Sequence, residues 1–232
     1  MVSNNTILKL VNIKKNYPGA VETKVLKGIN FEISQGEFVA IVGQSGSGKT
    51  TLLNLIGLID TPTEGEIYFK NEMVDFSNAK KLADTRNLNM GFIFQFHFLL
   101  TEFSVLENVL MPTWIKLKNN SFEFKKKAVD FLNFVGLSDE IHKKANQLSG
   151  GQQQRVAVAR ALVNESAIVF ADEPTGNLDS ENTKKIYSLL RDINREYNTT
   201  FVIVTHDLNI ANLCDRIIEI ADGQVISDRL NK

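Results

Sequence analysis

The feature that most restricts the fold of this 232-residue chain is the segment GQSGSGKT at residues 43–50. It matches the pattern G-x-x-x-x-G-K-[ST], in which a glycine-rich turn wraps around a phosphate group. A short apolar run at residues 38–42 precedes the turn, and apolar residues with helical spacing follow it from Leu52 to Leu58. A buried strand, a phosphate-binding turn and a helix in this order predict an α/β fold that binds a nucleoside triphosphate.

Each part of this turn has a chemical task. Glycines let the backbone curl so that several N–H groups point at one phosphate, and the start of the following helix adds partial positive charge. Lys49 is expected to reach the β- and γ-phosphates, and the hydroxyl of Thr50 is expected to bind Mg²⁺. The residues predicted to surround the phosphates are Gly43, Ser45, Gly46, Ser47, Gly48, Lys49, Thr50 and Thr51.

A second apolar run, at residues 168–171, ends in the adjacent carboxylates Asp172 and Glu173. Ligands of parallel α/β sheets bind at the carboxyl ends of the strands, and neighbouring strand residues point to opposite sides. The two carboxylates can therefore have different tasks. Asp172 is expected to hold Mg²⁺, directly or through water, and Glu173 is expected to accept a proton from the attacking water. An ordinary polar strand end before Pro174 is the alternative, and the phosphate-binding turn disfavours it.

The segment LSGGQ at residues 148–152 follows a predicted helical region and opens another helix. A Ser-Gly-Gly turn at a helix N-terminus presents backbone N–H groups to an anion. The chain therefore carries two predicted phosphate-binding helix starts that lie far apart in the sequence.

With this segment the chain resembles the ATP-binding cassette family, for which LSGGQ is the signature, and the resemblance covers essentially the whole chain. Gln95 matches the family's glutamine that senses Mg²⁺ and water, so the resemblance makes it a catalytic residue and a metal ligand. His206 matches the switch histidine that contacts the γ-phosphate. The D-loop is matched by Asn-Leu-Asp at residues 177–179, and the aromatic residue that stacks on adenine is matched by Tyr17.

The resemblance implies an ATPase that uses ATP and Mg²⁺ and forms a head-to-tail homodimer in the ATP-bound state. The phosphate loop of one subunit would face the signature of the other with ATP between them, and hydrolysis would weaken this contact and open the dimer. The residues expected to add to the nucleotide site from the signature and the D-loop are Ser149, Gly150, Gly151, Gln152 and Asp179.

The order of the predicted elements is strands, an α/β segment, a helical segment and a second α/β segment. Strands are expected at residues 7–13, 29–33, 38–42, 66–69, 90–94, 167–171 and 200–204. Helices are expected at residues 52–58, 105–118, 122–135, 152–163 and 181–197, with a short helix after Asp207 and a final hairpin around Gly223. The predicted fold is α/β, a P-loop NTPase (RecA-like) core with an N-terminal antiparallel β-subdomain and an inserted α-helical subdomain. Core and β-subdomain are assigned to residues 1–95 and 166–232 of a single domain, and the helical subdomain to residues 96–165.

Composition limits the classes of partner. A net charge of −1 and an isoelectric point near 6.3 argue against nucleic acid. The single cysteine, Cys214, cannot form an internal disulfide and is expected to be a small core residue. The first residues lack the apolar segment of a secretory signal, and no stretch approaches the ~18 apolar residues that span a bilayer. Any membrane role is therefore expected to run through integral membrane permease subunits, with this chain peripheral on the cytoplasmic face of the inner membrane.

Local segments suggest a group within the family. Residues 174–180 (PTGNLDS) resemble cassettes of macrolide exporters, the cell-division ATPase and the lipoprotein-releasing system. Residues 92–100 (FIFQFHFLL) and 106–109 (LENV) look most like the lipoprotein-releasing (Lol-type) ATPases, which extract lipoproteins from the bacterial inner membrane. Cell-division-type and macrolide-export-type cassettes stay open as alternatives. A non-transport cassette is disfavoured by the single cassette without a coiled-coil insert, and a regulator that does not hydrolyse ATP is disfavoured by the catalytic carboxylate and histidine.

Two further expectations concern particular residues. Of the five apolar residues that follow Gln95, two or three are expected in the core of the helical subdomain and one or two in a groove for a helix of a membrane partner. These five residues are Phe96, Phe98, Leu99, Leu100 and Phe103. Asn71 occupies a position where relatives often have a turn glycine, and it is expected to tolerate the left-handed backbone conformation.

Overall fold

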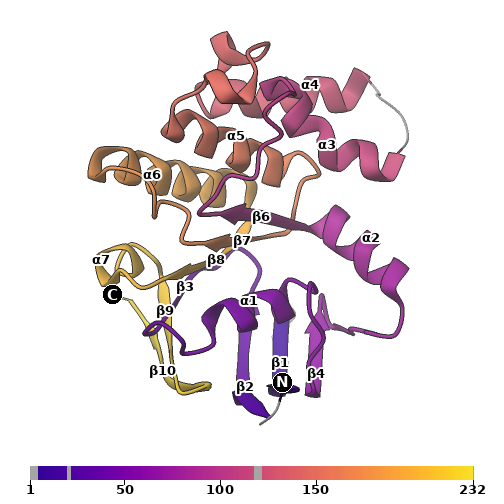
Figure 1. Ribbon diagram of the computed structural model, residues 1–232, viewed down its shortest axis with the longest axis vertical. Helices are drawn as coiled ribbons and strands as arrows, with labels where there is room; N and C mark the ends of the chain where they lie inside the picture. Colours follow the sequence, from indigo (N-terminus) through magenta and orange to yellow (C-terminus); the bar gives the residue numbers. More distant parts are fainter. Residues whose placement is uncertain (1–4, 20–21, 118–121, 232) are drawn as a thin grey trace.

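The computed structural model describes residues 5–19, 22–117 and 122–231, which form two β-sheets and a layer of helices (Figure 1). The larger sheet has the strand order β10-β9-β3-β8-β7-β6. Its strands are β3 (Phe38–Val42), β6 (Met90–Phe94), β7 (Ile168–Asp172), β8 (Thr200–Thr205), β9 (Arg216–Ala221) and β10 (Gln224–Leu230). All neighbours pair in parallel except β9 and β10, which form the hairpin predicted around Gly223.

The smaller sheet is antiparallel, as predicted, and has the order β2-β1-β4-β5. Its strands are β1 (Thr6–Tyr17), β2 (Thr23–Ser34), β4 (Glu64–Phe69) and β5 (Glu72–Met73). Strands β1 and β2 are longer than predicted, because they continue past their apolar centres as a polar ribbon in which Asn16 pairs with Lys24. Asn71 joins β4 to β5 with φ 64°, which confirms that it adopts the left-handed conformation.

Two clusters of buried side chains cover the two faces of the large sheet. Alternate residues of β3 belong to different clusters: Phe38 and Ala40 face the helices, and Val39 and Ile41 face the small sheet. Helix α1 (Lys49–Ile56) lies between the two sheets, and its buried face belongs to the second cluster (Figure 1). The core therefore fixes the end of β3 and the start of α1, which are the two sides of the glycine-rich turn.

The opposite face of the large sheet is covered by the helical segment and by α6. The helices there are α3 (Val105–Leu117), α4 (Phe122–Phe134), α5 (Gly150–Leu162) and α6 (Ser180–Tyr197), with short 3₁₀ turns at Ser138–Glu140 and Ala145–Gln147. Each of these α-helices was predicted, and so was the short helix α7 (Leu208–Ala211) after Asp207. The α/β core, the N-terminal antiparallel sheet and the helical insert confirm the predicted fold class.

One helix was missed in the sequence. Helix α2 (Ala79–Asn89) precedes β6, and none of its residues is buried. Helical periodicity is visible in a sequence only when one face of the helix is apolar, and α2 lacks such a face. None of the helices in the described parts of the chain is both long and apolar enough to cross a bilayer.

Two or three of the five apolar residues after Gln95 were expected in the core, and this expectation was wrong. Leu99 alone of the five packs against the core. Phe96 and Phe98 are 64% and 65% exposed, and Leu100 and Phe103 are exposed as well. Apolar identity indicates burial only on average, and this segment crosses the surface between β6 and α3. Cys214 is buried, as predicted.

Candidate functional site

Four adjacent strands of the large sheet end at the same edge. In each pair of neighbouring strands, the last residue of one strand lies opposite the last residue of the other or one position away from it. The phosphate loop follows β3, His206 follows β8, Glu173 follows β7 and Gln95 follows β6. Four segments that are remote in sequence therefore meet at the carboxyl ends of parallel strands, which is the ligand-binding edge of such sheets.

A cavity of about 410 Å³ opens at this edge. Its volume suits a small-molecule ligand. The cavity is lined by Val25, Ser45, Gly46, Gly48, Lys49, Thr50, Thr51, Asp172, Glu173, Val204 and His206. Nine of these residues were predicted from the sequence, whereas the two valines were missed because an apolar strand residue that faces a ligand looks like a core residue.

The phosphate loop needs its glycines for conformation and for space. Gly48 has φ 102°, and a Cβ atom there would lie 2.8 Å from the side chain of Leu26. The ammonium group of Lys49 donates to the carbonyl oxygens of Gly43 and Gln44 at 2.7 and 2.8 Å, so the side chain lies over the loop. The buried hydroxyl of Ser47 has no hydrogen-bond partner among the described residues. This hydroxyl lies outside the cavity wall, so the residues of the loop that face the cavity are Ser45, Gly46, Gly48, Lys49 and Thr50.

Asp172, the last residue of β7, lies half-buried at the cavity wall. Burial raises the pKa of its carboxyl group, the neighbouring charge of Glu173 raises it further, and the ammonium group of Lys49 opposes this rise. Ionisation therefore costs more at Asp172 than at an exposed aspartate, and a cation bound at the carboxylate would offset this cost.

Glu173 is held in place by the segment after β8. Its Oε1 accepts hydrogen bonds from the backbone N–H of His206 at 2.9 Å and contacts the imidazole Nδ1 at 2.5 Å. Its Oε2 accepts a hydrogen bond from the hydroxyl of Thr205 at 3.2 Å. The backbone of Glu173 has φ 45°, a conformation that costs a non-glycine residue about 1–3 kcal/mol. The left-handed backbone conformation at Glu173 is thus unfavourable in itself, and it directs the carboxylate into the cavity.

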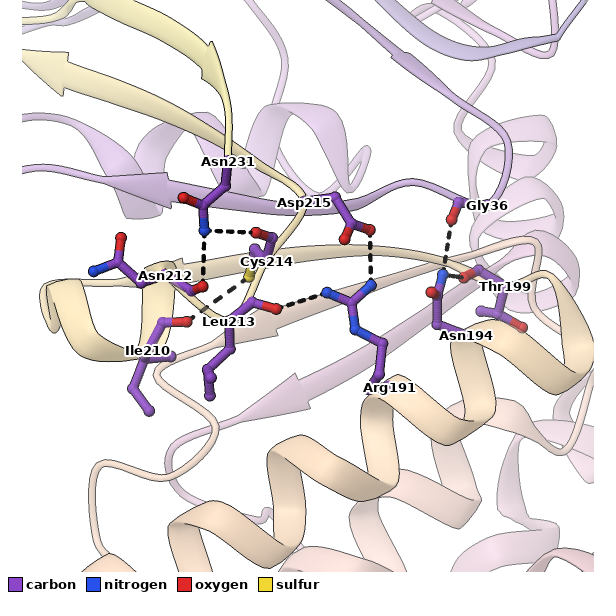
Figure 2. A network of polar contacts seen from close by, with 10 residues as sticks. All are labelled: Gly36, Arg191, Asn194, Thr199, Ile210, Asn212, Leu213, Cys214, Asp215 and Asn231. Carbon is purple, nitrogen blue, oxygen red and sulfur yellow. Dashed lines mark hydrogen bonds and ion pairs between the residues drawn. The ribbon is translucent and has the colours of Figure 1, made fainter.

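Figure 2 shows the contacts that hold residues 212–215, which follow the helix after His206. Arg191 of α6 donates to the carboxylate of Asp215 at 2.7 Å and to the carbonyl of Leu213 at 2.6 Å. The side-chain amide of Asn231 donates to the carbonyl oxygens of Asn212 and Cys214 at 2.7 and 3.0 Å. Helix α7 is therefore fixed at its C-terminal end, while the side chain of His206 is 74% exposed and contacts Glu173 through Nδ1.

Gln95 and Tyr17 lie near the cavity without lining it. The side chain of Gln95 donates to the amide oxygen of Asn177 at 3.3 Å, and the amide of Asn177 donates to the backbone carbonyl of Gln95 at 3.2 Å. Gly176 is packed so closely on this contact that a Cβ atom there would lie 2.8 Å from the Gln95 amide. Tyr17 is 38% exposed at the end of β1, and its hydroxyl donates to Asp60.

The signature forms a capped helix start, as predicted. The hydroxyl of Ser149 accepts from the backbone N–H of Gln152, and the Gln152 side chain accepts from the backbone N–H of Ser149. This turn lies against α6 and the D-loop, since a Cβ atom at Gly151 would lie 3.2 Å from Asn182, and one at Gly150 would lie 3.7 Å from Leu178. Asp179 caps α6 through the backbone N–H groups of Glu181 and Asn182. In the part of the chain that the structure describes, the cavity wall contains no residue of the signature or the D-loop.

The donor set at the cavity suits Mg²⁺ only together with phosphate oxygens. Among the described residues no three His, Cys, Asp or Glu side chains lie close enough to hold a metal ion by themselves. Mg²⁺ is usually bound by one or two carboxylates, water and the phosphates of a substrate. The hydroxyl of Thr50 and the carboxylate of Asp172 share one cavity with the phosphate loop and fit that arrangement.

The fold and this cavity define a P-loop nucleoside triphosphatase, with a glycine-rich turn between a buried strand and a helix and acidic residues at a neighbouring strand end. The ABC transporter family model matches residues 26–176, and the chain belongs to this family. It is 47% identical over 222 residues to the lipoprotein-releasing system ATP-binding protein LolD of Aquifex aeolicus (strain VF5), covering 96% of this chain and 97% of that protein. It is 50% identical over 220 residues to the LolD protein of Cytophaga hutchinsonii, covering 95% and 99% of the two chains.

Solved structures agree with this assignment. The bacterial ABC transporter cassette MJ0796, solved as a dimer, is 43% identical and superposes with a TM-score of 0.88 over 97% of this chain and 99% of its own. The same cassette has been solved as a dimer in a post-hydrolysis state with ADP and phosphate, again at a TM-score of 0.88. The chain is an ATP-hydrolysing subunit of the ABC type.

Proposed function

We propose that this chain hydrolyses ATP on the cytoplasmic face of the inner membrane to power membrane subunits that release lipoproteins. The observation that carries the ATPase part is the single cavity that joins the phosphate loop to Asp172, Glu173 and His206. Lipoprotein release is supported by 44–50% identity, over 94–96% of this chain, to proteins named as ATP-binding proteins of the lipoprotein-releasing system.

The phosphate loop binds and orients the triphosphate. Backbone N–H groups of the loop and of the first turn of α1 would donate to the phosphates, and the helix start adds positive charge. Lys49 leaves the carbonyl oxygens of Gly43 and Gln44 to reach the terminal phosphates. Thr50 and Asp172 would hold Mg²⁺, which when bound neutralises the charge that develops on the phosphate oxygens.

Glu173 and His206 act at the terminal phosphate. The carboxylate of Glu173 accepts a proton from the attacking water, because it lies on the cavity wall with its orientation fixed by Thr205 and the backbone of His206. The His206 imidazole leaves the carboxylate and donates to the γ-phosphate once ATP is present. Gln95 responds to the same phosphate from the end of β6 and contacts the D-loop through Asn177.

A second copy of the chain completes the nucleotide site. Ser149 and Gly150 are exposed, and they begin α5 with backbone N–H groups that can meet an anion. The signature is absent from the described wall of its own cavity, so its donors are available to the nucleotide of another subunit. Tyr17 stacks on adenine from the first subunit, and Asp179 and the other D-loop residues face the second one.

The membrane partner is proposed to dock beside α3. A cavity of about 400 Å³ lies between β6, α2, α3 and α5, and its apolar wall includes Phe92, Phe94, Pro112 and Ile115. Ile115 is 72% exposed, and the exposed ring of Phe98 packs edge-to-face on Phe94 at 5.4 Å. An exposed apolar groove of this kind suits a short cytoplasmic helix of a membrane subunit.

This groove is connected to both nucleotide-sensing segments. Arg160 lines it and donates to the backbone carbonyls of His97 and Phe98 at 2.7 and 2.8 Å, directly after Gln95. Arg160 belongs to α5, which starts at the signature. A partner helix seated in the groove would therefore contact the element that carries the signature and hold the segment that follows Gln95.

The partner surface is tested by Ile115→Asp. We expect this change to reduce co-purification of membrane subunits by at least about tenfold, because a carboxylate would have to be desolvated in an apolar contact. Binding of ATP to the purified chain is expected to stay at the wild-type level. Capture from detergent-solubilised membranes, followed by identification of the captured proteins, measures the effect.

The matched control is Ile226→Asp on β10, where an isoleucine of 58% exposure lies on another face. Equal capture by the Ile115 variant and the wild type would contradict the proposed surface. Capture of cell-division or exporter subunits in place of lipoprotein-releasing subunits would contradict the proposed substrate and leave the ATPase assignment intact.

A further inference from the structure

The side chains of Lys15, Tyr17 and Asp60 form a cluster between the end of β1 and the segment that follows α1. Lys15 and Tyr17 are two residues apart on β1 and lie on the same face of the strand. The hydroxyl of Tyr17 donates to Asp60 Oδ2 at 2.9 Å. The ammonium group of Lys15 donates to Asp60 Oδ1 at 2.7 Å and to the carbonyl of Thr61 at 2.8 Å. The same ammonium group lies 4.8 Å from the centre of the Tyr17 ring.

This cluster is more than a surface ion pair. The side chain of Lys15 is only 11% exposed, and an ammonium group is buried to this degree only where it is paired and hydrogen-bonded. Burial works to raise the pKa of Asp60, but the hydrogen bonds from Lys15, the Thr61 amide and Tyr17 outweigh it and lower the pKa. The carboxylate of Asp60 thus accepts hydrogen bonds from Lys15, Tyr17 and the backbone N–H of Thr61, and it connects the Tyr17 ring to the other two groups.

Asp60 also connects the ring to the phosphate-binding helix. The backbone N–H groups of Ile59 and Asp60 both donate to the carbonyl oxygen of Asn54, which lies in α1. The ring of Tyr17 is therefore tied through Asp60 to the helix that begins at Lys49. The Lys15 ammonium covers the ring, the hydroxyl is occupied, and the remaining surface of the 38% exposed side chain is open.

We propose that Asp60 and Lys15 are positioning residues for the nucleotide base, which hold the Tyr17 ring at a fixed place relative to α1 with its open face toward adenine. The inference rests on the proposed stacking of Tyr17 on adenine. The distance between the site for the base on Tyr17 and the site for the triphosphate at the start of α1 is then fixed before ATP binds. Preorganisation of this kind raises affinity, because fewer side chains lose conformational freedom when the ligand binds.

The test compares two ligands by calorimetry on the purified chain: MgATP, which has a base, and magnesium tripolyphosphate, which lacks one. Asp60→Ala is expected to weaken MgATP binding about three- to tenfold and to leave tripolyphosphate binding unchanged. Asp60→Asn keeps an acceptor for the Tyr17 hydroxyl and is expected to restore most of the affinity. In a Tyr17→Phe background, Asp60→Ala is expected to add less than about a twofold loss, since the hydroxyl contact is already absent.

The matched control is Glu64→Ala, which removes an exposed partner of Lys14 on the same strand and is expected to change neither affinity. Equal losses for both ligands in Asp60→Ala, or additive losses in the double variant, would overturn the proposal. Tyr17→Phe removes one oxygen from an exposed side chain and tests the same link should Asp60→Ala fail to fold. Wild-type protein that binds neither ligand would instead refute the ATP site, and unchanged ATP affinity in Tyr17→Ala would refute the stacking on which the proposal rests.

Discussion

Replacing Glu173 by glutamine is expected to lower kcat for ATP hydrolysis by at least about 100-fold while ATP binding is retained. Glutamine has the shape of glutamate but cannot accept a proton from water at neutral pH. The local structure tolerates the change, since the amide oxygen can still accept from the backbone N–H of His206 and the amide nitrogen can donate to the hydroxyl of Thr205. Steady-state phosphate release and equilibrium binding of MgATP measure the two effects separately.

The same variant is expected to accumulate as an ATP-bound dimer, because the event that opens the dimer no longer occurs. Size-exclusion chromatography with MgATP should show this dimer for Glu173→Gln and mainly monomer for wild-type protein that has hydrolysed its ATP. Glu66→Gln serves as a control, since Glu66 is an exposed carboxylate of β4 outside the cavity. Near-normal hydrolysis by the Glu173 variant would remove this residue from the mechanism.

The second large effect is expected for Lys49→Ala, which should weaken MgATP binding by on the order of 100-fold. Hydrogen bonds to charged groups contribute about 1.5–3 kcal/mol each, and 1.4 kcal/mol is a factor of ten, so the loss of two phosphate contacts accounts for this magnitude. In the free protein the ammonium group bonds to the carbonyl oxygens of Gly43 and Gln44, which can turn to solvent after the change.

Calorimetric titration with MgATP measures the loss, and far-ultraviolet circular dichroism confirms that the variant is folded. The control is Lys80→Ala, since Lys80 is an exposed lysine of α2. A Lys49 variant with wild-type affinity would place the triphosphate outside the cavity described here and would contradict the assigned site.

The strands that support the site were predictable because nearly all of their residues are buried. Strands β3, β7 and β8 are covered on both faces, so each appears in the sequence as a continuous apolar run. Helix α2 was not predictable, because it buries no residue and has no apolar face. Two or three of the five apolar residues after Gln95 were assigned to the core on their identity, and only the path of the chain shows that all but Leu99 lie on the surface.

Nine of the residues that line the cavity were predictable from motifs, whereas their contacts were not. The pattern at residues 43–50 and the paired carboxylates identify chemistry from residue type and spacing alone. The bond from Tyr17 to Asp60 joins residues that are 43 positions apart, and neither residue carries a local pattern that points to the other. The division of the chain into a core and a helical subdomain at residues 96–165 stays a prediction.

In the proposed dimer, one subunit contributes Lys49 and the other contributes Ser149 to the same ATP. The measurement uses two variants of the chain, both with Glu173→Gln and with Cys214 replaced. One variant also carries Ser45→Cys, beside Lys49, and the other also carries Ser149→Cys. The chains are mixed with MgATP and treated with a short bismaleimide, and the products are separated on a denaturing gel. We predict a crosslinked product of twice 26.0 kDa that requires both chains and ATP. No crosslink in the mixture, or equal crosslinking without nucleotide, would contradict the shared site.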